Sequence, residues 1–188
     1  MKIPNKEISL FFDRDGVINV DTGYPKDFKD LIFIEETINE LKILSDLGYQ
    51  IYIVTNQSGI ARGYFSKQQY LKLQKEIEFF LLEKGIKVIE TAFCPHHPEG
   101  IIEDYSFECE CRKPKIGMLR QLSNKYKFKL SNSAIIGDKV SDIKAGLDAG
   151  CSLLIYLGEE FRHSKAIPNI KNLKSLKNLS SIIYSHFK

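Results

Sequence analysis

FFDRDGVIN (residues 11–19) carries two aspartates, one residue apart, at the end of an apolar run. The run itself, ISLFF (8–12), is typical of a strand that is buried on both faces. An aspartate at a strand end is able to attack phosphorus, and a second carboxylate is able to protonate the leaving oxygen and later to deprotonate water. Gly16 permits the sharp turn that a close approach to a ligand needs. Because aspartate and glycine also favour ordinary turns, this segment alone leaves a plain polar turn open.

Outward from this segment, strand-like runs alternate with segments of helical periodicity. Strands are expected over 51–55, 88–94, 133–137 and 152–157, and helices over 37–49, 66–85, 116–126 and 141–150. The alternation predicts an α/β fold with a Rossmann-like parallel sheet flanked by helices. Ligands of such sheets gather beyond the carboxyl ends of the strands. The polar residues that end or follow predicted strands are therefore expected at one edge of the sheet: Asp13, Thr55, Cys94 and Asp138.

The rest of the chain adds no second unit. No linker divides the sequence, so a single domain over 1–188 is expected, and residues 16–36 are too few for a large cap domain. In the tail, NLKSLKNLSSIIYSHF (172–187), Leu173, Leu176, Leu179 and Ile183 at near-helical spacing predict a final helix packed on the core. A partner-binding helix is the alternative. Residues 159–169 before the tail are expected to form a loop.

Composition narrows the class of protein. Of 188 residues, 43% are hydrophobic and 27% are charged, which excludes extended disorder. The net charge of +3 is too small to indicate a nucleic-acid partner by itself. The sequence lacks the run of about 18 apolar residues that a membrane span needs. Its first residues, MKIPNKEISLFF (1–12), lack the apolar stretch of a signal peptide. A cytoplasmic monomer is expected, with no membrane partner.

Two polar motifs carry groups that suit phosphate. In VTNQSGIARG (54–63), hydroxyl and amide side chains surround backbone N–H groups that are able to hold phosphate oxygens. In CRKPK (111–115), Lys113 is able to neutralise a phosphate, and Arg112 to fork onto a second phosphate or a sugar. Taken singly, the first motif is better explained as an ordinary turn and the second as a solvated basic turn.

A further motif, IIGDKVSD (135–142), ends a strand at Asp138 and begins a helix. The Asp138 carboxylate, together with that of Asp13, is able to hold Mg²⁺, which prefers oxygen ligands. For Asp142 the helix dipole is the better explanation, because an acidic residue in the first turn of a helix is favoured there.

Cysteines and histidines cluster between residues 94 and 111. Cys94-x-His96 and Cys109-x-Cys111 form two pairs of thiolate and imidazole groups, which suit a closed, structural Zn²⁺ site. A disulfide and buried free thiols are the alternatives, and a reducing compartment disfavours the disulfide. His97 is open as a replacement for His96. Because this zinc loop (94–111) runs directly into Arg112 and Lys113, a bound zinc ion would hold the approach of both cations.

The order of these motifs resembles the haloacid dehalogenase superfamily of phosphotransferases, over about residues 8–157. The resemblance implies that Asp13 is the nucleophile and becomes an aspartyl phosphate, and that Asp15 is the general acid and base. It also implies that Thr55 binds the transferring phosphoryl group and that Lys113 stabilises it. An aspartate at position 15 goes with phosphatases and phosphotransferases rather than with dehalogenases.

Together with the zinc loop and TGY (22–24), the motifs resemble the branch of histidinol phosphatases and heptose-bisphosphate phosphatases. The resemblance implies substrate contacts from Asp21, Thr22, Gly23, Tyr24, Thr55, Asn56, Gln57, Ser58, Arg112, Lys113 and Lys139. It implies magnesium ligands at Asp13, Asp15 and Asp138, and zinc ligands at Cys94, His96, Cys109 and Cys111. Ile116 departs from the proline that the family often has there, which leaves the chemistry untouched.

The favoured function is a Mg²⁺-dependent phosphatase that acts on a small sugar bisphosphate. A histidinol-phosphate phosphatase is the alternative, because it shares these motifs. A cationic amine would favour an acidic loop; Asp21 gives one such charge, and Arg112 argues the other way. A zinc-stabilised interaction module without turnover is the alternative of another class. A nucleic-acid 3′-phosphatase is less favoured, because no aromatic-lined basic groove is apparent in the sequence.

Overall fold

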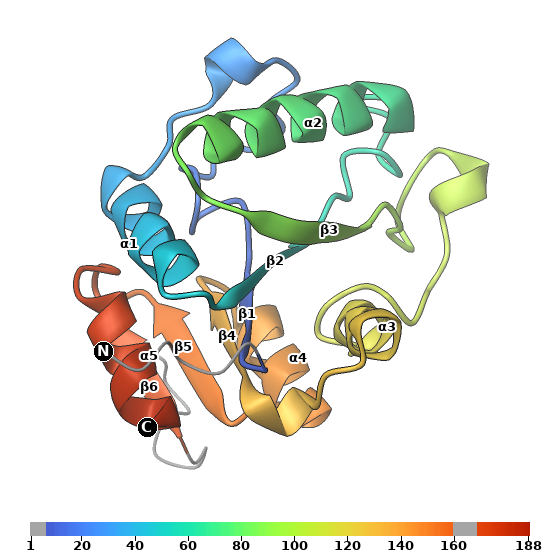
Figure 1. The fold of residues 1–188 in the computed structure, drawn as a ribbon. Coiled ribbons are helices and arrows are strands. Elements are labelled where there is room, and N and C mark those ends of the chain that lie inside the picture. The colour runs from blue at the N-terminus through green and yellow to red at the C-terminus, as the bar shows by residue number, and fades with distance from the viewer. Residues whose placement is uncertain (1–6, 160–168) are drawn as a thin grey trace.

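The structure is a computed structural model that describes residues 7–159 and 169–188. Six strands form one parallel sheet in the order β3-β2-β1-β4-β5-β6 (Figure 1). The strands are β1 Ser9–Phe12, β2 Gln50–Asn56, β3 Val88–Cys94, β4 Ser133–Gly137, β5 Leu153–Leu157 and β6 Ile170–Leu173. The α-helices are α1 Glu35–Asp46, α2 Lys67–Glu83, α3 Gly117–Tyr126, α4 Val140–Ala149 and α5 Leu179–Phe187. The predicted α/β fold with a parallel sheet is confirmed.

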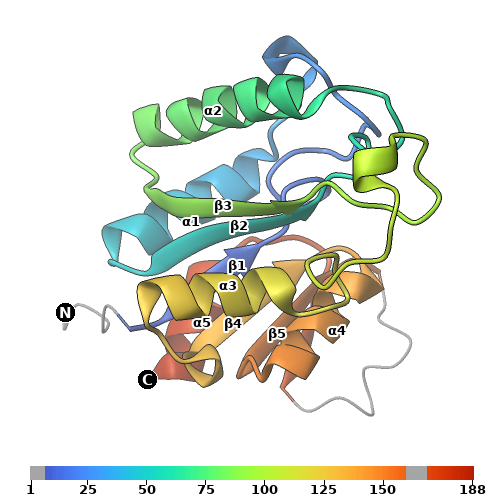
Figure 2. The ribbon, with the colours of Figure 1, turned by 90° about the vertical axis from the view of Figure 1, so that its right-hand side faces the viewer.

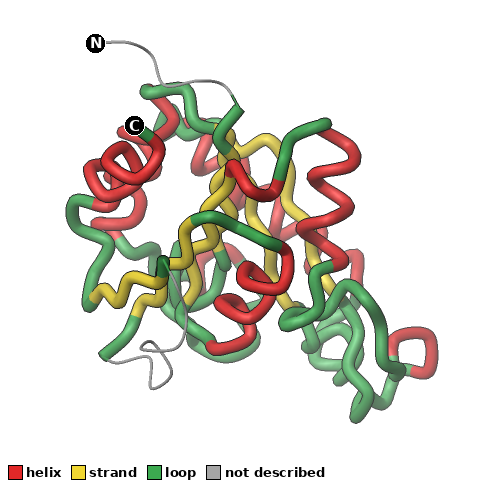
Figure 3. Tube along the Cα trace, turned by 90° about the horizontal axis from the view of Figure 1, so that it is seen from below, coloured by secondary structure: helices red, strands yellow, loops and turns green. Residues whose placement is uncertain are grey.

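Helices cover both faces of the sheet, which explains the continuous apolar runs of its strands. Successive strand residues point to opposite faces. Leu10 and Phe12 therefore pack in the cluster formed with α1, α2 and α5, and Phe11 packs in the cluster formed with α3 and α4. Figure 2 shows α3 and α4 in front of the strands and α1 behind them, and Figure 3 shows the strands crossing the middle of the molecule between helices.

The chain reverses its direction across the sheet next to β1. It runs from β1 through β2 to β3 on one side, and returns to pair β4 with the other side of β1. Phe12 is level with Ile53 of β2 and with Ile136 of β4. Ligands of open α/β sheets bind at such a reversal, beyond the carboxyl ends of the strands. The residues that follow β1, β2 and β4 therefore face one opening.

Two loops connect strands to helices at this end of the sheet. Between β1 and α1 lies a loop with the 3₁₀ turn Phe28–Asp30, and between β3 and α3 a loop with the turn Glu103–Tyr105. Neither connection holds a large cap domain, as predicted. No helix within the described ranges is long and apolar enough to cross a membrane.

Local sequence signals place the start of α2. The Ser66 hydroxyl accepts the backbone N–H of Gln69 at 3.1 Å, and the Gln69 side chain accepts that of Ser66 at 2.7 Å. This reciprocal pair satisfies two N–H groups that the first turn of a helix leaves free. The helix start predicted from Ser66 and Gln69 is therefore confirmed.

The prediction of one helix over the tail is wrong for its first half. Residues 170–173 form β6, which pairs in parallel with β5, and the helix begins only at Leu179. Pairing satisfies the edge of β5, which a helix would have left without partners. Leu176, Leu179 and Ile183 are still 0–1% exposed, so the predicted packing on the core is confirmed. Of the loop predicted at 159–169, residues 160–168 lie outside the described residues.

Candidate active site

Asp13 stands at the end of β1, between the two neighbouring strands. Its backbone N–H donates to the carbonyl of Ile136 at 2.9 Å, which continues the β1–β4 ladder past the end of the strand. The residue is 4% exposed. Its Oδ1 accepts from the backbone N–H of Arg14 at 2.8 Å and lies 3.0 Å from the Nζ of Lys113. Burial raises the pKa of Asp13 to about 7, although Lys113 opposes the rise. The carboxyl group of Asp13 therefore has a fixed orientation and is almost fully shielded from solvent.

Lys113 is buried among three acceptors. Its Nζ lies 3.0 Å from Asp13 and 2.8 Å from Asp142, and donates to the carbonyl of Val54 at 2.6 Å. Burial alone would lower the pKa of Lys113, but the two carboxylates raise it above its ordinary value. The ammonium group therefore stays charged beside Asp13, where an incoming phosphoryl group would need a cation.

Asp142 is a site residue that sequence reasoning missed. It is 1% exposed and holds Lys113 through Oδ1, while its Oδ2 accepts the backbone N–H of Lys139 at the start of α4. Asp142 therefore has the predicted role at the helix start and also pairs with Lys113. The available signal was the paired aspartates of GDKVSD, which alone did not distinguish a cap from a partner of Lys113.

Three carboxylates converge beside this lysine, and their arrangement shows whether the site suits a metal cation. Oxygens of Asp13, Asp138 and Asp142 lie within 4.8 Å of one another. Asp138 Oδ1 is buried and accepts no hydrogen bond, and burial raises the pKa of Asp138 to about 6. A Cβ at Gly16, where φ is +92°, would lie 2.1 Å from Asp138, so only glycine admits that carboxylate. This all-oxygen donor set fits Mg²⁺.

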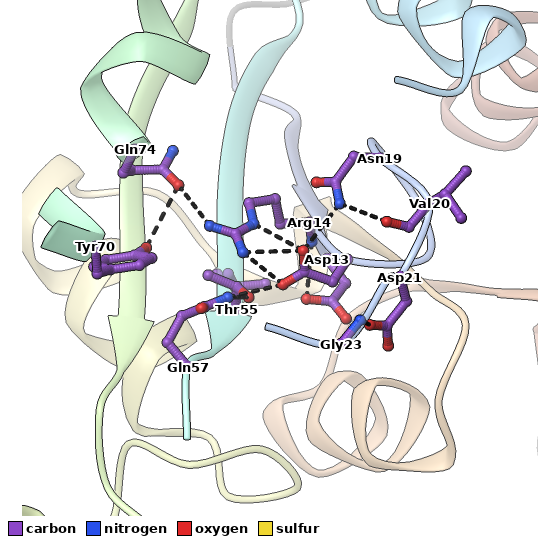
Figure 4. Close-up of polar contacts among 12 residues, drawn as sticks. Asp13, Arg14, Asn19, Val20, Asp21, Gly23, Thr55, Gln57, Tyr70 and Gln74 are labelled. Atoms are coloured by element: carbon purple, nitrogen blue, oxygen red, sulfur yellow. Dashed lines mark hydrogen bonds and ion pairs between the residues drawn. The ribbon is translucent and has the colours of Figure 1, made fainter. Parts of the chain in front are cut away.

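Three side chains that Figure 4 labels donate to the carboxylate of Asp15: Arg14, Asn19 and Gln57. Arg14 donates to both of its oxygens, from Nη2 at 2.9 and 2.8 Å and from Nε at 3.1 Å. Asn19 donates to Oδ1 at 3.0 Å, and Gln57 donates to Oδ2 at 2.8 Å. Asp15 therefore has a fixed orientation before any substrate enters.

The residues at the end of β2 have different partners, although sequence resemblance groups them as substrate contacts. The Asn56 side chain pairs with both backbone groups of Lys113, at 3.0 Å for each hydrogen bond. The Gln57 amide donates to Thr55 Oγ1 at 2.9 Å as well as to Asp15. Asn56 thus holds the lysine segment in place, and Gln57 links the end of β2 to the end of β1.

A pocket of about 360 Å³ opens above these groups. Its lining includes Asp15, Asp21, Gly23, Tyr24, Asn56, Gln57, Ser58, Arg112, Lys113 and Lys139. Lys139 pairs with Asp21 across the mouth at 2.9 Å. Burial alone would raise the pKa of Asp21, but hydrogen bonds from Lys139 and Gly23 lower it. The structure thus brings most of the predicted substrate residues together; Thr22 is outside the lining and Thr55 lies buried beneath it.

The predicted zinc ligands also meet. Cys94 Sγ lies 3.5 Å from Cys109 Sγ and 3.6 Å from His96 Nδ1, and Cys111 Sγ lies 3.3 Å from Cys109 Sγ and 3.2 Å from His96 Nδ1. Donors of a tetrahedral site with a Zn–S bond of about 2.3 Å would be about 3.8 Å apart. The cluster is close to that size, and its three sulfurs and one nitrogen suit zinc.

Two alternatives left open by the sequence are decided by these contacts. His97 pairs instead with Arg62, whose Nη2 lies 3.0 Å from Nε2, so His96 is the histidine of the cluster. All four cysteines are free thiols, which excludes the disulfide. Arg112 donates to the carbonyl of His96 at 3.3 Å, so the cluster and the pocket are joined through one residue.

Comparison with known proteins places the chain among phosphatases. The family model described as polynucleotide kinase 3 phosphatase matches residues 9–164. The D-glycero-alpha-D-manno-heptose-1,7-bisphosphate 7-phosphatase of Photorhabdus laumondii is 45% identical over 146 residues, 78% of this chain and 80% of that protein. The D-glycero-beta-D-manno-heptose-1,7-bisphosphate 7-phosphatase of Haemophilus ducreyi is 40% identical over 176 residues, 93% of this chain and 94% of that protein.

A solved structure agrees with this comparison. The D,D-heptose 1,7-bisphosphate phosphatase from B. bronchiseptica, in complex with magnesium and phosphate, superposes with a TM-score of 0.80. The two sequences are 25% identical, and the match covers 94% of this chain and 98% of that one. The chain thus shares its fold with a phosphatase whose structure was solved with magnesium and phosphate.

Proposed function

The chain belongs to the polynucleotide kinase 3 phosphatase family of haloacid dehalogenase-like phosphatases, and we propose that it removes the 7-phosphate of D-glycero-D-manno-heptose 1,7-bisphosphate. It is a phosphoric monoester hydrolase. The observation that carries the choice of substrate is the pocket, whose lining adds the guanidinium of Arg112 to the ammonium of Lys113 and so supplies a cation for a second phosphate. The resemblance implies a place in the assembly of activated heptose for bacterial surface polysaccharide.

In the proposed mechanism, Asp13 attacks the phosphorus of the 7-phosphate and forms an aspartyl phosphate. Asp15 gives its proton to the sugar oxygen as the P–O bond breaks. Asp15 then takes a proton from water as that water attacks the aspartyl phosphate, and inorganic phosphate leaves. Lys113 and Thr55 neutralise and orient the phosphoryl oxygens throughout.

Magnesium and zinc have separate proposed tasks. Asp13 and Asp138 would hold Mg²⁺, with the backbone carbonyl of Asp15, and the ion would screen the charge of the phosphoryl group. Zinc on Cys94, His96, Cys109 and Cys111 would be structural, because four protein ligands close its coordination. We place the protein in the cytoplasm as a monomer, where sugar phosphates and reduced thiols occur together.

The alternative substrates fit the site less well. Histidinol phosphate would be favoured by a free acidic contact for its amine, but Asp21 is already neutralised by Lys139 at 2.9 Å. A polynucleotide would need a groove that follows several nucleotides, whereas the pocket encloses about 360 Å³. A sugar bisphosphate matches both the size and the charge of the pocket.

The test is phosphate release with Mg²⁺ from both anomers of heptose 1,7-bisphosphate, with histidinol phosphate in parallel. We expect the heptose bisphosphates to have the higher kcat/KM, and the favoured anomer to identify the substrate. A preference for histidinol phosphate would refute the proposed substrate and keep the mechanism.

A second measurement separates an enzyme from an interaction module. Asp13→Asn should abolish turnover and leave the fold and the zinc content unchanged, because the amide has the shape of the carboxylate but does not attack phosphorus, and Asp13 does not belong to the zinc cluster. The exposed Asp148→Asn on α4 is the matched control and should retain activity. Equal activity of the two variants would mean that Asp13 is not the nucleophile.

A further inference from the structure

Arg14, the residue between the two aspartates, is buried behind the site. It is 1% exposed, although it is among the largest side chains of the chain, and it does not line the pocket. A buried guanidinium group is costly unless its charge and its donors are matched. The contacts of Arg14 therefore indicate what the residue is for.

The guanidinium forks onto one carboxylate. Its Nη2 reaches both oxygens of Asp15, at 2.9 and 2.8 Å, and its Nε reaches Oδ1 at 3.1 Å. A planar fork of this kind fixes the plane of a carboxylate as well as its position, which a lysine ammonium does not do. Arg14 thus determines how the proposed acid and base is oriented.

The far side of Arg14 is anchored by α2 and β3. Its Nη1 donates to Gln74 Oε1 at 3.5 Å, and its guanidinium carbon lies 5.7 Å from the centre of the Tyr70 ring (Figure 4). The Gln74 amide in turn donates to Thr91 Oγ1 at 3.0 Å and to Glu78 at 3.2 Å. The fork therefore rests on two secondary-structure elements rather than on a loop.

The two remaining donors to Asp15, Asn19 and Gln57, differ in whether they face the pocket. Asn19 is 0% exposed and donates to Oδ1, whereas Gln57 lines the pocket and donates to Oδ2. A carboxylate oxygen offers about two lone-pair sites, and both sites of Oδ2 are taken by Arg14 and Gln57. A proton can enter or leave Oδ2 only when one donor withdraws, and Gln57 is the donor on the pocket side.

We propose that Arg14 is a positioning residue that holds Asp15 with Oδ2 toward the pocket, so that this oxygen exchanges its proton while Gln57 moves aside. The inference rests on the proposed mechanism. In the first step the proton of Oδ2 passes to the leaving oxygen as its bond to phosphorus breaks. In the second step Oδ2 takes a proton from the attacking water. Arg14 keeps its three hydrogen bonds to Asp15 in each step.

The test compares two substrates that differ in their leaving group. A nitrophenolate leaves without being protonated, whereas the oxygen of a sugar needs a proton from Asp15 to leave. For Arg14→Gln and Arg14→Lys, kcat on the sugar bisphosphate should fall by about 100-fold or more, the size of a general acid–base contribution, with KM little changed. With 4-nitrophenyl phosphate, a rapid burst of about one nitrophenolate per chain should persist, followed by slow turnover, because only the second step then needs Asp15. Asp15→Asn should give the same pattern.

Two outcomes would overturn the inference. If Arg14→Lys restores kcat, the buried charge is sufficient and the fork is not needed. If both substrates lose activity by one factor and the burst shrinks with them, Arg14 merely supports the fold. A wild-type protein that hydrolyses 4-nitrophenyl phosphate but ignores the sugar bisphosphate would refute the proposed substrate, and the bursts of the variants would still decide the role of Arg14.

A variant outside the site keeps the test decisive if the Arg14 variants do not fold. Gln74→Leu removes the far anchor of the fork and should lower kcat on the sugar bisphosphate by about tenfold, with the burst retained. Gln68→Leu, an exposed position on the same helix, is the matched control and should behave as the wild type. Equal kcat for the two variants would contradict the anchoring part of the inference.

Discussion

At the scale of single residues, two carboxylates link magnesium binding to pH, the buried Asp13 and the half-buried Asp138. Burial raises the pKa of Asp13 to about 7 and that of Asp138 to about 6, from 3.8. Both folded values lie above the unfolded ones, so the stability that these groups give the metal-free fold is present at low pH. It is lost as the pH rises from about 4 through about 7.

Magnesium must displace these protons, so its affinity should rise with pH over the same range. We expect binding to tighten between pH 6 and pH 8, by up to about tenfold per unit for each proton released. Titration calorimetry in buffers of different ionisation enthalpy measures both the affinity and the proton release. An affinity that is independent of pH, without proton release, would contradict the prediction.

Asn56 is the second residue whose partner defines a prediction. Because its amide matches both backbone groups of Lys113, Asn56→Asp replaces a donor by an acceptor against the Lys113 carbonyl. We expect a loss of about 1–3 kcal/mol of unfolding free energy and a fall in kcat, because the ammonium group shifts. Asn124→Asp, exposed on α3, is the control. A rise in KM alone would instead make Asn56 a substrate contact.

At the scale of elements, the zinc cluster joins the end of β3 to the segment that carries Arg112 and Lys113. Cys111→Ser should lower the zinc content from about one ion per chain, because it removes one of four ligands. It should also lower kcat/KM by about tenfold or more, because the two cations lose their fixed approach. Metal analysis and steady-state kinetics measure these effects. Cys151→Ser, outside the cluster, should keep the zinc; loss of zinc in both variants would contradict the assignment.

The start of α5 depends on a side chain from α1. The buried Glu40 accepts the backbone N–H of Asn178 at 2.8 Å and that of Ser180 at 2.7 Å. Glu40→Gln places an amide donor against one of these donors and should cost about 1–3 kcal/mol of unfolding free energy. Urea unfolding measures the change, with the exposed Glu36→Gln of the same helix as the control. The same midpoint for both variants would show that the cap contributes nothing.

At the scale of the whole molecule, residues 7–159 and 169–188 form no large cap, which leaves selectivity to the charges at the pocket. Arg112→Met should raise KM for the sugar bisphosphate by about 10- to 100-fold, the value of one charge-assisted hydrogen bond. KM for a monophosphate should change little, because only the second phosphate loses its partner. Lys115→Met is the control, since Lys115 is paired with Glu110 and does not line the pocket. An equal rise for both substrates would mean that Arg112 serves the transferred phosphate.

Some features of this fold could be predicted from the sequence, and others could not. The positions of Asp13, Thr55 and Asp138 at strand ends could be predicted from apolar runs, because a strand is indicated by its own local sequence. Their place at the ligand-binding edge could be predicted because that edge is the same in all open α/β sheets. The edge strand β6 did not follow, because Leu173 also fits the helical spacing of the tail until β5 offers it a partner strand.

By itself, the sequence determined the fold class, the edge of the sheet where the chemistry lies, and the residue types for phosphate, magnesium and zinc. Only the tertiary structure decided that Asp142 holds Lys113, that Asn56 holds its backbone, that His96 rather than His97 joins the cysteines, and that Arg14 orients Asp15. The physical reason is distance along the chain. Lys113 stands 57 positions from Asn56, and whether two such residues meet depends on how the strands pack and not on their own neighbours.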